Sequence, residues 1–189
     1  MSILITGANG QLGTELQQLF DEKKVAYTAT DSTEMDITNL SQVEEVFQSV
    51  QPTYVFHCAA YTAVDKAEDE GKETNELVNI TGTRNIAELA EQYGATLFYI
   101  STDYVFDGTF TGEYEVDAET NPRNEYGRAK LAGEQAVQEV SSKYYIVRTS
   151  WVFGERGPNF VYTMKRLAET HPVLTVVSDN SGALLGHIH

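Results

Sequence analysis

Tyr126 and Lys130 lie four residues apart and could together form a proton donor. Side chains at this spacing share one face of a helix, with Cβ atoms about 5–6 Å apart. A free phenol has a pKa near 10, and a cation within about 4–6 Å lowers it by roughly 1–3 pH units, which suits an acid working at neutral pH. The hydroxyl of Thr102, at the end of an expected strand, could hold a carbonyl oxygen for protonation. The structural alternative is a tyrosine ring packed on a lysine stem.

A glycine-rich turn near the N-terminus predicts a phosphate-binding site. The apolar run 2–6 leads directly into Gly7, Gly10 and Gly13, and a helical pattern starts near Leu12. Gly7 permits a tight turn, Gly10 lets backbone amides approach a pyrophosphate, and Gly13 lets the helix pack closely on the strand. The order of strand, glycine turn and helix indicates nucleotide binding, although such a turn can also be purely structural.

The rest of the chain alternates between expected strands and helices. We expect strands at 2–6, 25–30, 54–58, 97–101, 145–148 and 174–177. We expect helices from about 12 to 20, 40–50 with a Ser41/Glu44 capping box, 73–93 ending at Gly94, one from Tyr126, and 159–171 with Phe160, Met164 and Leu167 inward. This order predicts an α/β fold with a doubly wound, Rossmann-like parallel sheet of six strands.

The carboxyl ends of such strands form the binding edge of the sheet. Asp31, about 20 residues beyond the glycine turn, ends the second strand, where a carboxylate can accept hydrogen bonds from ribose hydroxyls and repels a 2′-phosphate. A turn carboxylate is the alternative interpretation. Within the third strand, His57 is interpreted as a core histidine rather than a catalyst.

Five motifs carry a family resemblance. Segments 7–13, 101–106 and 126–130 together resemble the extended short-chain dehydrogenase/reductase superfamily. Segments 57–68 and 148–154 make the chain similar to the dTDP-4-dehydrorhamnose reductase family within it. The resemblance implies an oxidoreductase that reduces the 4-keto group of a dTDP-4-keto-6-deoxy sugar with NADPH or NADH to give dTDP-L-rhamnose.

The resemblance also implies residue roles. Tyr126 would donate the proton, Lys130 would hold the nicotinamide ribose, and Thr102 would hydrogen-bond the carbonyl oxygen. The cofactor-binding residues would be Gly7, Gly10, Gln11, Leu12, Gly13, Asp31, Asp36, Ile37, Ala60, Tyr61, Thr62, Tyr126 and Lys130. The substrate-binding residues would be Thr102, Asp103, Tyr126 and Trp151, with Trp151 in the core as the alternative. Asn79 would be an internal brace, and no metal is expected.

Composition limits the partners. The formal net charge of −15 disfavours nucleic acid and anionic membranes as partners, and no apolar run is long enough to span a bilayer. With one cysteine, Cys58, and no signal-peptide pattern, we expect a cytoplasmic protein. Arg156, Lys165 and Arg166 are the best local cations for a diphosphate, although solvation of a helix surface explains them equally well.

Two alternatives remain open. A sugar-nucleotide dehydratase of the same superfamily carries Glu where this chain has Tyr104, which argues for reduction alone. A non-catalytic cofactor-binding regulatory subunit also resembles this family. The resemblance ends near Asp179, so we expect a cofactor-binding domain at 1–179, a non-family tail at 180–189, a largely missing substrate lobe and impaired turnover. A homodimer is a further expectation.

Overall fold

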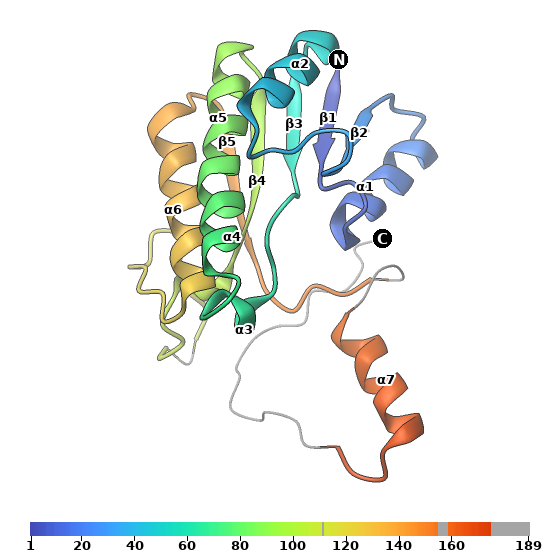
Figure 1. The fold of residues 1–189 in the computed structure, drawn as a ribbon, viewed down its shortest axis with the longest axis vertical. Helices are drawn as coiled ribbons and strands as arrows, with labels where there is room; N and C mark the ends of the chain where they lie inside the picture. Colours follow the sequence, from blue (N-terminus) through green and yellow to red (C-terminus); the bar gives the residue numbers. More distant parts are fainter. Residues whose placement is uncertain (111, 155–158, 175–189) are drawn as a thin grey trace.

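The computed structural model describes residues 1–110, 112–154 and 159–174. Five parallel strands form one sheet in the order β2-β1-β3-β4-β5 (Figure 1). The strands are β1 Ile3–Thr6, β2 Thr28–Thr30, β3 Tyr54–His57, β4 Thr96–Thr102 and β5 Tyr144–Thr149. The predicted parallel α/β sheet is therefore confirmed for five strands. The expected sixth strand at 174–177 falls, except for Leu174, outside the described residues.

Helices cover both faces of the sheet (Figure 1). The α-helices of the described residues are α1 Gln11–Glu22, α2 Leu40–Val50, α3 Val64–Ala67, α4 Lys72–Glu76, α5 Thr83–Gln92, α6 Glu125–Val140 and α7 Phe160–Thr170, with a 3₁₀ turn at Asp103–Val105. One core joins the sheet to α2, α5 and α6 through Leu4, Val55, Leu97 and neighbouring apolar side chains. A smaller core on the other face joins Ile3 and Ile5 to α1. Successive strand residues alternate between these two cores, as the pleat requires.

The helix expected at 73–93 contains a π-helical segment. Leu77–Gly82 is π-helical between α4 and α5, and Gly94 follows α5 with φ +67°. The Gly94 N–H donates to the carbonyl of Glu91 at 3.0 Å, so the expected glycine cap is present. Single π turns inside α-helices often mark functional sites, and this one carries Asn79.

The predicted capping box of α2 is wrong. The cap is Asn39, whose side-chain oxygen accepts from the backbone N–H groups of Ser41 at 3.1 Å and Gln42 at 3.4 Å. Because α2 begins at Leu40, Ser41 already lies in the first turn and supplies an N–H that needs a cap.

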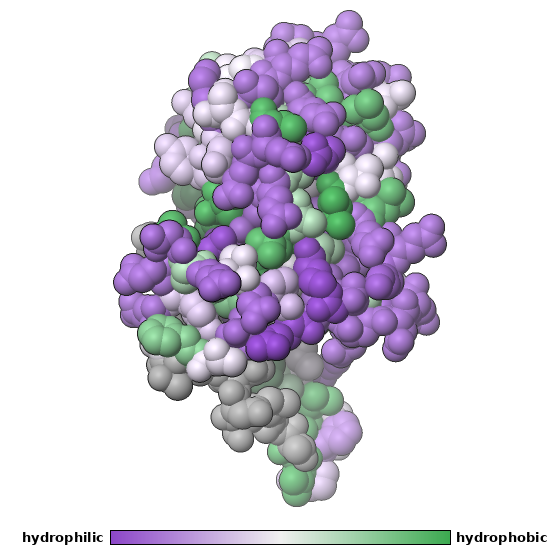
Figure 2. All heavy atoms as spheres, turned by 90° about the vertical axis from the view of Figure 1, so that its left-hand side faces the viewer, coloured by the Kyte–Doolittle hydropathy of each residue, from purple (hydrophilic) through white to green (hydrophobic). Residues whose placement is uncertain are grey.

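The expected inward face of α7 is only partly formed. Met164 and Leu167 are half-buried, Phe160 is exposed, and no side chain of α7 is fully buried. Figure 1 shows α7 apart from the sheet, beyond the carboxyl ends of the strands. Viewed from the side of α6, the surface is mainly hydrophilic, and apolar residues show at the lower end, where α7 lies (Figure 2). An amphipathic helix buries its apolar face only where another element covers it.

Among the described residues β5 is an edge strand of the sheet, and its Tyr145 is 59% exposed. Phe98 of β4 stacks on Phe56 of β3 with ring centroids 4.7 Å apart and on Tyr145 at 5.0 Å, so a row of aromatic rings crosses β3, β4 and β5. In the described part of the chain, no helix is long and apolar enough to cross a bilayer.

Candidate active site

A cavity of about 840 Å³ lies at the carboxyl ends of the central strands. It is lined by most residues proposed for the cofactor: Gly7, Gly10, Gln11, Leu12, Gly13, Asp31, Asp36, Ile37, Ala60, Tyr61 and Thr62. Sequence reasoning missed further lining residues: Asn9, Ser32, Met35, Cys58, Ala59, Val78, Ile100, Thr149 and Val152. Missed residues next to a predicted strand end, such as Ala59 and Thr149, could have been found by extending the predicted site by one residue at that end. No sequence pattern pointed to Val78 or Val152 as lining residues.

The glycine turn is closely packed. Gly7 has φ +65°, and a Cβ there would lie 2.6 Å from the backbone nitrogen and Cα of Ala59. A Cβ on Gly13 would lie 2.4 Å from the carbonyl oxygen of Gly7. Gly10 is the N-cap of α1, and no side chain caps the first amides of this helix. The start of α1 therefore offers backbone donors and the positive end of a helix dipole to an anion.

Asp31 is held at the end of β2. Its carboxylate accepts from the backbone N–H groups of Asn9 at 2.9 Å and Ser32 at 2.8 Å. The carboxylate of Glu34 accepts from the Asp31 N–H at 3.0 Å. A carboxylate that lines the cavity, as Asp31 does, can accept from hydroxyl groups and repels a phosphate.

Thr102 and Tyr126 meet at the end of β4. The Thr102 hydroxyl donates to Asp103 Oδ1 at 3.1 Å and accepts from the Tyr104 N–H at 3.2 Å. Tyr126, 9% exposed in the first turn of α6, also forms a side-chain hydrogen bond with Thr102. Burial raises the pKa of Tyr126 to about 12, the Thr102 hydrogen bond opposes this rise, and the charge on Asp103 adds to it.

Lys130 does not lower the pKa of Tyr126, contrary to the expectation from spacing. Lys130 is 2% exposed, and its ammonium donates to the carbonyl of Ile100 at 2.7 Å and lies 4.2 Å from the ring centroid of Tyr99. These contacts of the ammonium are therefore with β4. Burial lowers the pKa of Lys130 to about 7, and Glu134 and Cys58 oppose this shift.

His57 is a core histidine, as predicted. Its ring nitrogens lie 2.7 Å from Thr6 Oγ1 and 3.2 Å from Thr83 Oγ1, and its ring stacks on Tyr99 with centroids 5.7 Å apart. Burial, followed by the charge of Lys130, lowers the pKa of His57 to about 3. The folded protein therefore holds His57 with its ring neutral at neutral pH.

This burial predicts a pH-dependent stability. Because the folded pKa lies below the unfolded value of about 6.5, the stabilisation from neutral His57 is full above pH 6.5 and is lost as the pH falls towards 3. The stability gap between the parent and His57→Gln should narrow by about 1.4 kcal/mol per pH unit below 6.5. Urea unfolding between pH 7.5 and 4.5 measures it, with exposed His171→Gln as the control. Parallel curves for the parent and His57→Gln would contradict the assignment.

Asn79 braces the loop at Tyr61 from within, as expected. Its side-chain amide accepts from the Tyr61 N–H at 3.1 Å and donates to the Tyr61 carbonyl at 3.0 Å and to Asn75 Oδ1 at 2.8 Å. Asn75 in turn donates to the carbonyl of Glu125 at 3.1 Å. Two buried amides thus join the loop at Tyr61 to the start of α6, beside Tyr126.

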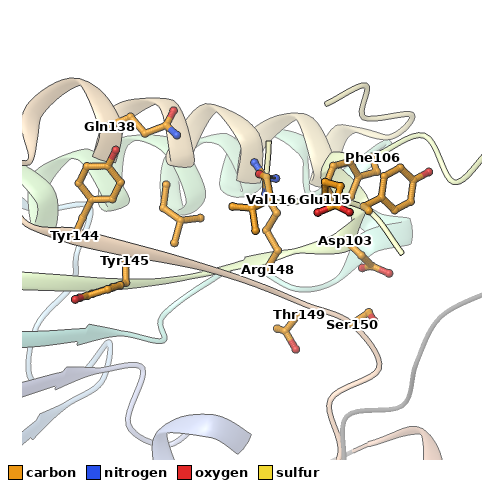
Figure 3. Close-up of a pocket in the computed structure, with 12 residues that line it drawn as sticks. Asp103, Phe106, Glu115, Val116, Gln138, Tyr144, Tyr145, Arg148, Thr149 and Ser150 are labelled. Atoms are coloured by element: carbon orange, nitrogen blue, oxygen red, sulfur yellow. Dashed lines mark hydrogen bonds between the residues drawn. The ribbon is translucent and has the colours of Figure 1, made fainter. Parts of the chain in front are cut away.

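A second cavity of about 610 Å³ runs along β5 (Figure 3). Asp103, Thr149 and Ser150 lie at one end, and Tyr144 and Tyr145 lie at the other (Figure 3). Burial raises the pKa of Asp103, and the Thr102 hydrogen bond opposes that rise. Asp103, at this end of the cavity, follows Thr102 directly in the sequence.

The remaining candidates are not brought together by the described structure. Trp151 packs edge-to-face on Phe160 with centroids 5.1 Å apart and lines neither cavity. Lys165 and Arg166 are exposed on α7. Arg156 lies outside the described residues. The described residues contain no group of three or more His, Cys, Asp or Glu placed to hold a metal ion.

Known proteins resemble this chain over almost its whole length. Residues 1–183 match the family described as the RmlD substrate binding domain. The dTDP-4-dehydrorhamnose reductase of Aggregatibacter actinomycetemcomitans is 42% identical over 181 residues, which cover 95% of this chain and 61% of the relative. That of Streptomyces griseus is 44% identical over 180 residues, covering 95% and 59%. The chain thus spans about 60% of the length of these curated relatives.

Solved structures of dTDP-4-dehydrorhamnose reductases are also similar to this chain. A dTDP-4-dehydrorhamnose reductase ortholog from Clostridium acetobutylicum superposes with a TM-score of 0.94 and 46% identity, covering 98% of this chain and 66% of that one. The reductase of Bacillus anthracis in complex with NADP gives 0.86 and 46%, covering 90% and 60%. A Thermus thermophilus UDP-glucose 4-epimerase in complex with NAD, at 24% identity and a TM-score of 0.79 over 89% of this chain and 62% of that one, shares the fold. The family match over residues 1–183 and these identities show that the chain belongs to the RmlD family of dTDP-4-dehydrorhamnose reductases.

Proposed function

We propose that this chain binds NADH or NADPH and carries the proton donor for reduction of the 4-keto group of a dTDP-4-keto-6-deoxy sugar to give dTDP-L-rhamnose. The observation that carries the proposal is the pairing of Thr102 and Tyr126 at the carboxyl end of β4, near a cavity that begins at the glycine turn. The net charge still disfavours nucleic acid and membranes as partners, and we expect a cytoplasmic location. A homodimer stays a hypothesis.

The larger cavity fits a dinucleotide. Its volume of about 840 Å³ lies within the range of small-molecule sites, about 300–1,000 Å³. The closely packed Gly7 and Gly13 and the uncapped start of α1 suit a pyrophosphate, which needs backbone amides at short range. Asp31, which lines the cavity, suits a ribose hydroxyl. Lys130 does not line the cavity and is proposed to hold the ribose next to the nicotinamide.

The proposed mechanism assigns one proton to Tyr126. The cofactor, when bound, supplies the hydride. Tyr126 donates its phenolic proton to the ketone oxygen, and the Thr102 hydroxyl hydrogen-bonds the same oxygen. Because burial raises the pKa of Tyr126 to about 12, the phenol keeps its proton at neutral pH until the oxygen gains negative charge. Asp103 and Trp151 are proposed to contact the sugar.

Absorbance of the reduced cofactor tests the proposal. The protein is incubated with NADH or NADPH and a dTDP-4-keto-6-deoxy sugar, and cofactor affinity is measured separately by fluorescence titration. Consumption of the reduced cofactor with formation of dTDP-L-rhamnose supports a reductase. Tight cofactor binding without turnover favours a regulatory subunit. A dehydratase is disfavoured because Tyr104 stands where that enzyme needs a carboxylic acid.

Asp31 should set the cofactor preference. Asp31→Ser removes the carboxylate that repels a 2′-phosphate, so the affinity for NADPH relative to NADH should rise about tenfold, or about 1.4 kcal/mol. The control is Asp36→Asn, which removes another carboxylate of the cavity at the proposed adenine end and should alter both affinities alike. An unchanged ratio of NADPH to NADH affinity in Asp31→Ser would show that Asp31 does not contact the ribose.

A further inference from the structure

Among the described residues, Glu134 is the one buried carboxylic acid, and it lies one helical turn after Lys130 in α6. Its side chain is 1% exposed. One carboxylate oxygen accepts from the Ser101 hydroxyl and from Arg148 Nε at 3.0 Å, and the other accepts from an Arg148 terminal nitrogen at 2.7 Å. Sequence reasoning gave Glu134 no role.

This carboxylate lies in a cluster that also holds a buried cation. The ammonium of Lys130 lies over the Tyr99 ring of β4, and its charge acts on the pKa of His57 of β3 and of Cys58 after it. Glu134, one turn further along the same helix, opposes the fall in the pKa of Lys130 and is itself paired to Arg148 of β5. The side chains of Asn79 and Thr83, from the neighbouring helical segments, are polar and uncharged. Among these groups Glu134 is the one carboxylate, and it faces two cations, Lys130 and Arg148.

The direct contacts of Lys130 supply no negative charge. The ammonium donates to the Ile100 carbonyl and lies over the Tyr99 ring, and both are neutral partners. A buried charge without a nearby opposite charge is expensive, and the group then tends to lose its proton. Burial lowers the pKa of Lys130 to about 7, and Glu134 is the strongest of the groups that oppose this shift.

We propose that Glu134 is a positioning residue, which supplies the negative charge that keeps Lys130 an ammonium beneath β4 and ready to bind the ribose. Arg148 tempers this effect by sharing the carboxylate, and Ser101 fixes the carboxylate next to Thr102. The ribose contact rests on the proposed function. The link between Glu134 and the protonation of Lys130 does not, because it is a property of the protein alone.

Two variants break the same ion pair, between Glu134 and Arg148, and should shift the pH midpoint of the Lys130 titration in opposite directions. Glu134→Gln removes the negative charge, so the pH midpoint of Lys130 should fall by about one pH unit or more. Arg148→Gln leaves Glu134 unshared, so the midpoint should rise. The matched control is Glu139→Gln on the same helix, whose side chain is 66% exposed and pairs with Arg84; its midpoint should stay at the parent value.

The midpoint is read from the ¹³Cε resonance of Lys130 in lysine-labelled protein, assigned by its loss in Lys130→Met. The measurement needs no cofactor. Folding of each variant is checked by urea unfolding. Damage to packing alone would move both midpoints in one direction, and such a result, or an unchanged midpoint in Glu134→Gln, would overturn the proposal.

Cofactor titration then tests the consequence. For a midpoint moved from about 7 to about 6, the charged fraction at pH 7 falls about fivefold, so the affinity of Glu134→Gln for NADH should fall about fivefold at that pH and recover towards pH 5.5. If the pH midpoint of Lys130 shifts in Glu134→Gln but the pH dependence of NADH affinity does not, the ribose contact is refuted. The effect of Glu134 on the protonation of Lys130 would still hold. A parent that binds no cofactor would refute the proposed function alone.

Discussion

Replacing Tyr126 with Phe should lower the rate of ketone reduction by about 10²–10⁴-fold while cofactor affinity stays within about twofold of the parent. The phenyl ring keeps the buried position and the edge-to-face contact with Tyr104, whose ring centroid lies 5.7 Å away. The variant loses only the hydroxyl that bonds Thr102 and donates the proton. Stopped-flow absorbance with saturating cofactor measures the effect.

The matched control is Tyr104→Phe, which removes a hydroxyl from the neighbouring ring and should keep the rate within about threefold. A Tyr126→Phe protein with a near-parent rate would move the proton donor elsewhere. Asp103 would then be the first alternative, because it is hydrogen-bonded to Thr102 and burial raises its pKa.

Replacing Gly7 with Ala should abolish measurable cofactor binding and reduce the free energy of unfolding by about 3 kcal/mol or more. A non-glycine residue in this left-handed conformation costs about 1–3 kcal/mol. The added Cβ would also lie 2.6 Å from backbone atoms of Ala59, which cannot move without shifting β3 and the loop after it.

Gly94 provides the control for this variant. Its φ of +67° nearly equals the +65° of Gly7, but no atom lies within 4 Å of the position that a Cβ would occupy. Gly94→Ala should therefore cost only the backbone strain, about 1–3 kcal/mol, and leave cofactor affinity unchanged. Urea unfolding and fluorescence titration compare the two variants. Equal losses in both would show that the contact with Ala59 adds nothing.

Several features of the fold follow from local sequence. The glycine turn between β1 and α1, the apolar runs of β3 and β4, and the cap at Gly94 depend on residues close together in the chain, so periodicity and turn chemistry predict them. The same reasoning placed Thr102 at a strand end. It misplaced the cap of α2 by two residues, because Asn39 and Ser41 are both good caps and local sequence does not decide which of them begins the helix.

The sequence by itself determined the order of the elements, the glycine turn and the shared helix face of Tyr126 and Lys130. The tertiary structure decided where Lys130 points and what surrounds it, because its partners come from other strands: the Ile100 carbonyl and the Tyr99 ring from β4, and the Arg148 that shares Glu134 from β5. Burial and charge at a site depend on groups distant in sequence, whereas spacing along a helix does not. For that reason the pKa of Tyr126 rises to about 12, against the fall that spacing predicted.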